Sequence, residues 1–184
     1  SSSVVTFISG EDSTAVLTGL TLTNGYTTIT GGGGIRIENS SPRLKNLKIS
    51  NSVANVGGGG ISCDACDSRI TDVNISNNYV TGIGGGIRVF NGSNPELLGV
   101  MIANNTATLN GGGIAYEGLP ASTIDQKLHR VSIVGNTSSG GVGGGVYLYS
   151  SLATVTRSFI QNNSASLKGG CLLYTSDAAD DCEG

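Results

Sequence analysis

The side chains that could take part in chemistry recur at two fixed positions after five runs of glycine. The first position, directly after the apolar residue that ends each run, holds Arg36, Ser62, Arg88, Ala115 and Tyr147. The second, two residues further on, holds Glu38, Asp64, Phe90, Glu117 and Tyr149. If the glycine runs stack, Glu38 and Asp64 lie about 5 Å apart, which is the separation of a retaining glycosidase pair.

The same spacing arises between any two carboxylates on neighbouring rungs of a ladder. Arg36 and Arg88 are expected to lie close enough to neutralise both Glu38 and Asp64. We therefore favour a solvated salt-bridge ladder over a weak glycan or calcium site, and either of these over catalysis. Phe90, Tyr147 and Tyr149 add aromatic rings to the same columns, which suggests carbohydrate contact on one exposed face.

One repeat is longer than the others, because the interval from Glu117 to Leu128 exceeds the matching intervals elsewhere. We predict that residues 118–127 project as a loop from the face just described. This loop would bring Asp125, Lys127 and the only histidine, His129, near Glu117. Loops on rigid scaffolds often carry function, so it is the second candidate site. A lone histidine without a nucleophile or metal partner is most often an ordinary surface residue.

Two of the four cysteines, Cys63 and Cys66, form a CDAC motif, and the other two are near the C-terminus. A zinc site would need two further ligands at suitable spacing, and none is visible. Cys63 falls at an inward position that Ile37 and Val89 share, which favours a small core residue. Cys66 is its candidate disulfide partner if the chain is outside the cytoplasm, and a pair of incidental thiols is the alternative.

Two repeated sequence motifs, called phrases here, must position these residues. One is "GGGI" or a close variant, and the other is typified by "ITDVNISNN" at residues 70–78. Within each phrase apolar residues alternate with polar ones, which indicates short strands with one buried face and not amphipathic helices. The glycine motif recurs every 26 to 32 residues. Self-similarity at such a period is typical of solenoids. The sequence predicts an all-β, single-stranded parallel β-helix of about six coils of 26–27 residues, with no substantial helix.

Glycine and asparagine recur where such coils would bend. Glycine tolerates the positive φ and close backbone approach of a sharp bend. One column of asparagines comprises Asn24, Asn51, Asn77, Asn104 and Asn162, with Gly135 as the exception. We expect this column to adopt left-handed turns and its stacked amides to hydrogen-bond from coil to coil. Asn78, Asn105, Asn136 and Asn163 form a partial second column. Both are interpreted as structural.

The phrase "GLTLTNG", followed by the repeated "GGGI" and "NN" elements, resembles the pectin-lyase-like right-handed parallel β-helix superfamily. More narrowly, it is similar to the Gly-rich repeats of secreted and surface proteins of bacteria, including the polymorphic outer-membrane protein type. The resemblance covers residues 17–168 and implies right-handed winding. Polysaccharide lyases and hydrolases on this fold use acidic clusters with calcium or paired carboxylates, together with basic residues. Neither their compact aspartate set nor a lyase arginine signature is present here.

We therefore expect a non-catalytic extracellular or cell-surface module of a bacterium, acting as a stalk or adhesion element with glycans as partners. The alternative is a fragment of a polysaccharide lyase or glycoside hydrolase of the same superfamily. No catalytic residue and no cofactor is assigned, although calcium stays a candidate. A net charge of −3 without a Lys/Arg cluster disfavours nucleic acid, and no apolar run is long enough to span a membrane.

We expect residues 1–170 to be a β-helix domain that is part of a longer solenoid. Residues 171–184, "CLLYTSDAADDCEG", are acidic and lack the repeated phrases. Residues 171–181 resemble one translated frame of a sequencing-library adaptor, so we predict that 171–184 is a non-native tail. An uncapped last coil would expose a sheet edge and favour end-to-end association.

Overall fold

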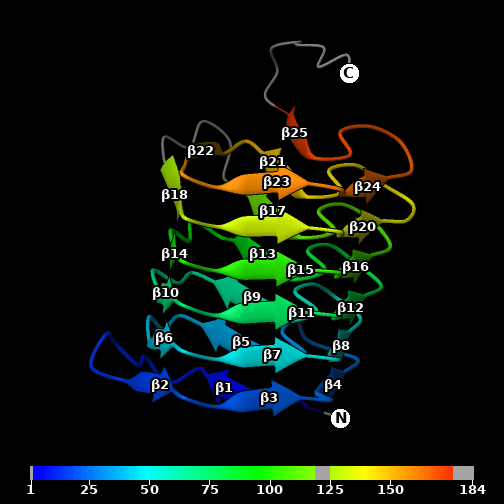
Figure 1. The fold of residues 1–184 in the computed structure, drawn as a ribbon. Helices are drawn as coiled ribbons and strands as arrows, with labels where there is room; N and C mark the ends of the chain where they lie inside the picture. The colour runs from blue at the N-terminus through cyan, green and yellow to red at the C-terminus, as the bar shows by residue number, and fades with distance from the viewer. Residues whose placement is uncertain (1, 119–124, 176–184) are drawn as a thin grey trace.

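The strands of the computed structural model stack as successive windings of one chain (Figure 1). The structure describes residues 2–118 and 125–175, and this part of the chain contains no helix. All pairing between its strands is parallel and joins each strand to the strand one coil earlier or later. The predicted all-β parallel solenoid is therefore confirmed.

Four sheets run along the stack, and each is named here after its first strand. The β1 sheet contains β1 (Val5–Phe7), β5 (Ile35–Glu38), β9 (Ile61–Asp64), β13 (Ile87–Phe90), β17 (Ile114–Glu117), β21 (Val146–Tyr149) and β25 (Leu172–Thr175). The β2 sheet contains β2 (Val16–Thr18), β6 (Arg43–Lys45), β10 (Arg69–Thr71), β14 (Glu96–Leu98), β18 (Asp125–His129) and β22 (Leu152–Thr156).

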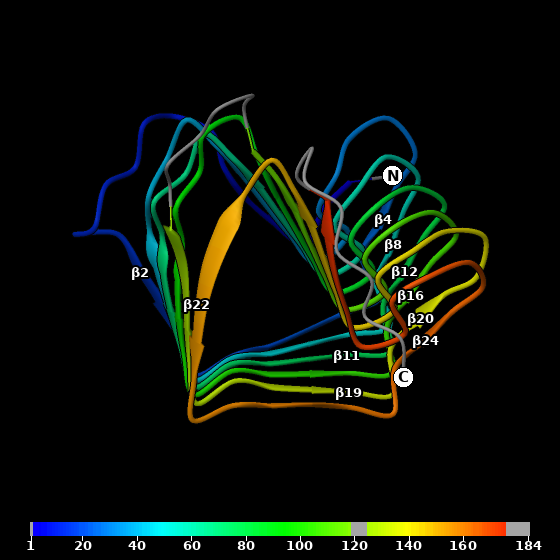
Figure 2. The same cartoon turned by 90° about the horizontal axis from the view of Figure 1, so that it is seen from above.

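The other two sheets complete each coil. The β3 sheet contains β3 (Thr21–Thr23), β7 (Lys48–Ser50), β11 (Asn74–Ser76), β15 (Met101–Ala103), β19 (Ser132–Val134) and β23 (Phe159–Gln161). The β4 sheet contains β4 (Tyr26–Thr27), β8 (Val53–Ala54), β12 (Tyr79–Val80), β16 (Thr106–Ala107), β20 (Thr137–Ser138) and β24 (Ser164–Ala165). Seen from above, the coils superimpose around a common interior, and the loops that follow the β4 sheet project to one side (Figure 2).

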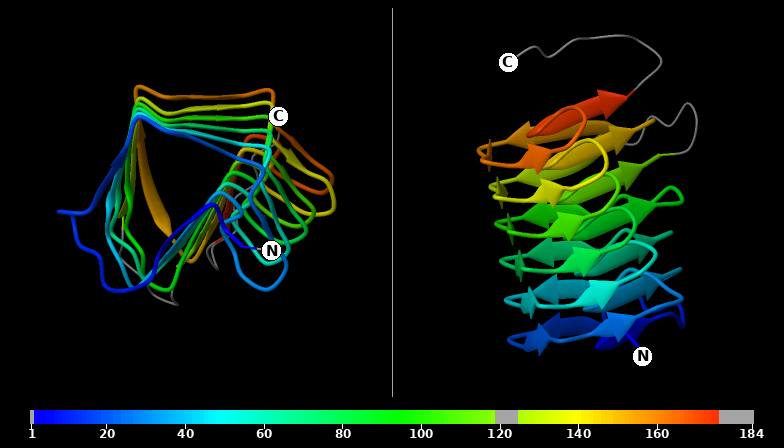
Figure 3. Two further views of the ribbon diagram at one scale, coloured as in Figure 1. Left: turned by 90° about the horizontal axis from the view of Figure 1, so that it is seen from below. Right: turned by 90° about the vertical axis from the view of Figure 1, so that its right-hand side faces the viewer.

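The core consists of columns of like residues. Ile35, Ile61 and Ile87 are paired in register and fully buried. The β2 and β3 sheets add matching columns that include Leu44, Ile70, Leu97, Ile49, Ile75 and Ile102. Burying each such side chain stabilises the fold by about 1.5–3 kcal/mol. The views from below and from the side show how regularly the coils repeat (Figure 3).

The glycine runs occupy positions where a side chain has no room. Gly84 has a φ of +75°, which glycine adopts far more readily than other residues. A Cβ at Gly86 would lie 2.6 Å from the carbonyl oxygen of Gly113 in the next coil and 2.8 Å from Ile102 Cγ2. Close approach of neighbouring coils is therefore what the repeated glycines provide.

The two asparagine columns have different roles. Asn24, Asn51, Asn77, Asn104 and Asn162 all have positive φ, between 53° and 59°. The coil-to-coil amide bonds run instead through the second column, contrary to our expectation for the first. Asn78, Asn105 and Asn136 each donate through Nδ2 to the Oδ1 of the asparagine one coil further on, over 3.0 Å, and the series ends at Asn163. The first-column side chains are exposed at a left-handed bend. Only the asparagines that follow them in the sequence can therefore hydrogen-bond inside the stack.

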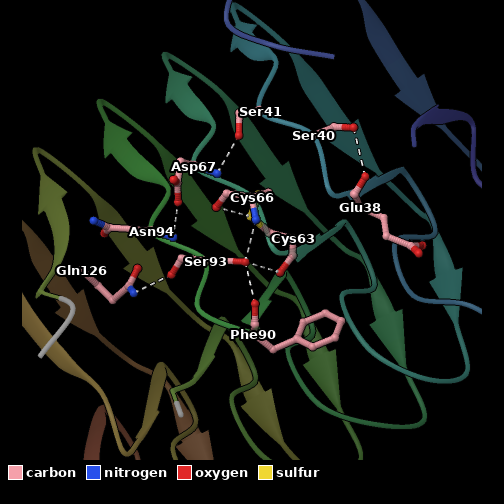
Figure 4. The surroundings of a disulfide bond; sticks show 10 residues. All are labelled: Glu38, Ser40, Ser41, Cys63, Cys66, Asp67, Phe90, Ser93, Asn94 and Gln126. Atoms are coloured by element: carbon pink, nitrogen blue, oxygen red, sulfur yellow. Dashed lines mark hydrogen bonds between the residues drawn. A yellow bond between two sulfur atoms is a disulfide. The ribbon is translucent and has the colours of Figure 1, made fainter. Parts of the chain in front are cut away.

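A disulfide joins Cys63 and Cys66, and both residues are buried (Figure 4). It encloses Ala65, which has a φ of +47°. The matching positions in the neighbouring coils are Asn39 and Asn91, at φ +48° and +54°. Alanine is costlier than asparagine in this conformation, because asparagine visits the left-handed region readily. Of these three matching bends, the disulfide therefore lies at the one where alanine, and not asparagine, adopts the left-handed conformation.

We expect Ala65→Asn to raise the free energy of unfolding by about 0.5–1 kcal/mol, since it relieves this left-handed penalty at an exposed position. Urea denaturation under oxidising conditions measures the change. As a matched variant, Ala65→Val should lower stability because β-branched residues are the least tolerant of positive φ. Equal effects of the two variants would contradict the explanation.

The last described strand, β25, pairs with β21 in the β1 sheet. Residues 176–184 lie outside the described residues. The boundary predicted at residue 170, and the assignment of 171–184 as a non-native tail, stay predictions.

Candidate functional site

The outer face of the β1 sheet is the main candidate site, and the structure places the predicted residues on it in register. Glu38 pairs with Asp64, Asp64 with Phe90, Phe90 with Glu117, and Glu117 with Tyr149. The first column runs beside it from Arg36 to Tyr147 through the same strands. These side chains are mostly half-buried, and Tyr149 is the most open, at 50% exposure.

The glycine loops cover part of this face. Ser62 and Ala115, which were expected to point into solvent, are buried. A Cβ at Gly31 would lie 2.6 Å from Ser62 Oγ, and one at Gly111 would lie 2.7 Å from Ala115 Cβ. The loops therefore lie against the first column, and the second column carries most of the accessible chemistry.

Each carboxylate of the face has a partner. Arg36 donates to Glu38 within one strand. Arg88 Nε donates to Glu117 Oε2 over 2.5 Å, and its guanidinium lies 4.2 Å from the centre of the Phe90 ring. The prediction that Arg88 would neutralise Glu38 and Asp64 is wrong: its column neighbour Ala115 is small, so Arg88 can extend past it to Glu117. Asp64 Oδ1 accepts a 2.7 Å bond from Asn91 Nδ2.

Two tyrosines of β21 add aromatic rings to the face near its C-terminal end. The rings of Tyr147 and Tyr149 have centroids 6.4 Å apart and planes inclined by only 16°. Residues two apart in a strand point the same way, which explains this arrangement. Tyr149 neighbours Glu117 across the strands, so the ring pair adjoins the Arg88–Glu117 ion pair.

A small cavity of about 10 Å³ lies behind this region, and Tyr116, Gln126, Ser93 and Glu117 are among its lining residues. Tyr116 is fully buried, and burial raises the pKa of its phenol. Its hydroxyl and Gln126 Oε1 have no hydrogen-bond partner within the described residues. Alternation placed Tyr116 inside the coil, but no sequence pattern indicated that Gln126 would face the same cavity.

The second candidate site is not the loop that we expected. Asp125, Lys127 and His129 lie on strand β18 of the β2 sheet, paired with Leu152, Thr154 and Thr156 of β22. Gln126 and Leu128 alternate with them and are buried, which is why this segment extends the sheet. Asp125 Oδ2 accepts from Thr154 Oγ1 at 2.7 Å, and His129 Nδ1 lies 2.8 Å from Thr156 Oγ1. The remaining predicted loop residues, 119–124, lie outside the described residues.

Residues 2–118 and 125–175 contain neither a candidate metal cluster nor a membrane-spanning helix. No three His, Cys, Asp or Glu side chains come together there as a potential metal site. No helix in the same ranges has the length and apolar character needed to traverse a bilayer. Calcium binding stays an untested prediction.

Parallel coils, columns of like core residues and an internal asparagine ladder define the class of parallel β-helix solenoid proteins. A family model described as a right handed beta helix region matches residues 6–182. The chain therefore belongs to the right-handed β-helix family, which confirms the winding and the resemblance to the pectin-lyase-like superfamily. No curated protein and no solved structure matches the chain significantly.

Proposed function

We propose that the chain is a non-catalytic module of an extracellular or cell-surface protein that contacts glycans through the outer face of its β1 sheet. The observation that carries this proposal is the Tyr147–Tyr149 ring pair beside the Arg88–Glu117 ion pair. A stalk or adhesion role suits a rigid rod of stacked coils. The resemblance to Gly-rich repeats of bacterial surface proteins supports a bacterial source.

The composition of the face suits a sugar ring. The flat face of a pyranose carries C–H groups that pack on an aromatic ring, and its edge carries hydroxyls. Tyr149, half exposed, offers the aromatic surface, with its own hydroxyl as a polar tip. Glu117 and Arg88 next to it offer an acceptor and several donors for sugar hydroxyls. This combination of apolar surface and a few placed polar groups is typical of ligand sites.

The pairing of the carboxylates supports a non-catalytic role. A retaining glycosidase needs one carboxyl group as an acid and a second as a nucleophile. Glu38 and Asp64 are adjacent in the column, but one is bound to Arg36 and the other to Asn91. Glu117 has Phe90 and Tyr149 as its column neighbours, so no carboxylate adjoins it there.

The buried disulfide supports the proposed location. Disulfides persist in secreted and cell-surface proteins and are rare in the reducing cytosol. Cys63 and Cys66 form such a bond within the core of the coil. An extracellular or cell-surface setting is consistent with that chemistry.

We expect Tyr149→Ala to weaken glycan binding about ten-fold, because removal of a stacked ring costs roughly 0.5–1.5 kcal/mol beyond its lost contact area. A glycan array would first identify the oligosaccharide that binds most strongly, and calorimetry would then compare variants. Tyr79→Ala is the matched control, since Tyr79 is also a partly exposed tyrosine but lies on the β4 sheet. Equal losses in both variants, or none in Tyr149→Ala, would overturn the proposed face.

Activity assays test the non-catalytic part separately. The parent chain is incubated with a panel of polysaccharides, with and without calcium, and products are measured by reducing ends and by absorbance of unsaturated sugars. We expect no cleavage. Cleavage by the parent that is lost in Glu38→Gln or Asp64→Asn would establish the lyase or hydrolase alternative instead.

A further inference from the structure

A basic groove lies on the outer face of the β2 sheet, away from the site described above. Its volume is about 350 Å³, and it is lined by Val16, Arg43, Leu44, Lys45, Arg69 and Thr71. Arg43 and Lys45 come from β6, and Arg69 comes from β10 in the next coil. Among the described residues, three cations and no carboxylate therefore line this groove, on a chain whose net charge is −3.

The register sets like charges against each other in this groove. Arg43 and Arg69 are direct partners across the parallel pair β6–β10. Like charges at such opposed positions destabilise a sheet. Arg69 has one ion pair, with Glu96 Oε2 at 3.1 Å on its far side. Arg43 and Lys45 form no ion pair within residues 2–118 and 125–175, so the groove has an uncompensated positive charge.

We propose that this groove binds the carboxylate or sulfate groups of an acidic polysaccharide. An oxyanion between Arg43 and Arg69 would remove their repulsion, and arginine guanidinium groups bind such groups in a bidentate manner. Lys45 adds a point charge at the neighbouring outward position, and the Thr71 hydroxyl adds a neutral donor. All three cations are exposed, so they can reach a ligand without movement of the backbone.

The groove suits a saccharide better than a nucleic acid. None of the described residues that line it is aromatic, although ring stacking of bases contributes much of the affinity for single strands. Val16, half exposed at the edge, gives the C–H groups of a sugar an apolar contact.

The test uses three polymers with one backbone: dextran, carboxymethyl dextran and dextran sulfate, titrated into the intact chain at low and at high ionic strength. We expect both acidic polymers to bind at low salt, dextran not to bind, and high salt to weaken the binding. The double variant Arg43→Gln/Lys45→Gln should bind them about ten-fold more weakly, from two- to five-fold per charge. Binding of only one acidic polymer would show whether sulfate or carboxylate is the recognised group.

Lys48→Gln is the matched control, because Lys48 is an exposed lysine of the same coil on the β3 sheet, outside the groove. Its binding should stay within two-fold of the parent. Equal losses in Lys48→Gln and the double variant, absence of binding to both acidic polymers, or tighter binding of duplex DNA than of dextran sulfate would each overturn the proposal. The β1-sheet site is tested separately, with Tyr149→Ala and the oligosaccharide selected on the array, so failure here and failure of that site are distinguishable.

Discussion

Asn105→Ala is expected to lower the free energy of unfolding by about 4 kcal/mol, because it interrupts the internal asparagine ladder. Asn105 is fully buried. Its Oδ1 accepts bonds from the backbone N–H and the Nδ2 of Asn78, at 2.9 and 3.0 Å. Its Nδ2 donates to the carbonyl of Ile75 and to Asn136 Oδ1. Alanine would leave the buried backbone N–H of Asn78 without its acceptor, and it would remove one hydrogen bond each from Asn78 Nδ2, the Ile75 carbonyl and Asn136 Oδ1 in two neighbouring coils. Urea denaturation followed by circular dichroism measures the loss.

The preceding residue provides the control. Asn104 is exposed and has a φ of 55°, so Asn104→Gly keeps the conformation that the bend requires. Gly135 already occupies the matching place in the next coil, with a φ of 67°. We expect Asn104→Gly to change stability by less than about 0.5 kcal/mol. Similar losses in the two variants would contradict the division of roles between the columns.

Gly86→Ala should also cost about 4 kcal/mol, through overpacking between coils. The new Cβ would lie 2.6 Å from the Gly113 carbonyl oxygen, 2.8 Å from Ile102 Cγ2 and 3.2 Å from Asn105 Nδ2. Two of these neighbours cannot yield easily, since one is backbone and the other is packed in the core. The coils must therefore separate locally, which also lengthens the bonds of the asparagine ladder. The midpoint of thermal or urea unfolding reports the effect.

Gly92→Ala separates this steric effect from the general loss of a glycine. Gly92 has a φ of +75°, and a Cβ there would have no neighbour within 4 Å. Only the left-handed penalty of about 1–2 kcal/mol should then appear. A loss at Gly86 no greater than that at Gly92 would show that the coils adjust freely, contrary to the packing described here.

Much of the fold could be predicted from the sequence because a solenoid repeats local rules. Alternation of apolar residues identified the inward columns, and glycine and asparagine marked the bends. The predictions that were wrong concern segments whose structure depends on contacts between coils. Asp125, Lys127 and His129 join β18, since Gln126 and Leu128 can turn inward and the strand can pair with β22. The last three residues of the expected loop, 125–127, thus belong to a sheet, and residues 119–124 lie outside the described part.

The sequence predicted which residues of the candidate site share a column, but it did not predict which side chains contact one another. Spacing placed Glu38 beside Asp64 and Glu117 beside Tyr149. It did not show that Arg88 extends to Glu117, or that glycine loops cover Ser62 and Ala115. Those outcomes depend on side-chain length and on how far each loop folds back, and neither follows from periodicity.

By itself the sequence determined that this chain forms parallel coils with an apolar interior, because each repeat carries the same local pattern of burial and bending. Only the tertiary structure decided which side chains of different coils meet. The basic groove is the clearest instance: no cluster of lysine and arginine is visible along the chain, yet Arg43, Lys45 and Arg69 line one groove. Stacking brings residues one full repeat apart to adjacent strands, at the spacing of a sheet. Basic residues that are far apart in the sequence therefore lie close together on the surface of the solenoid.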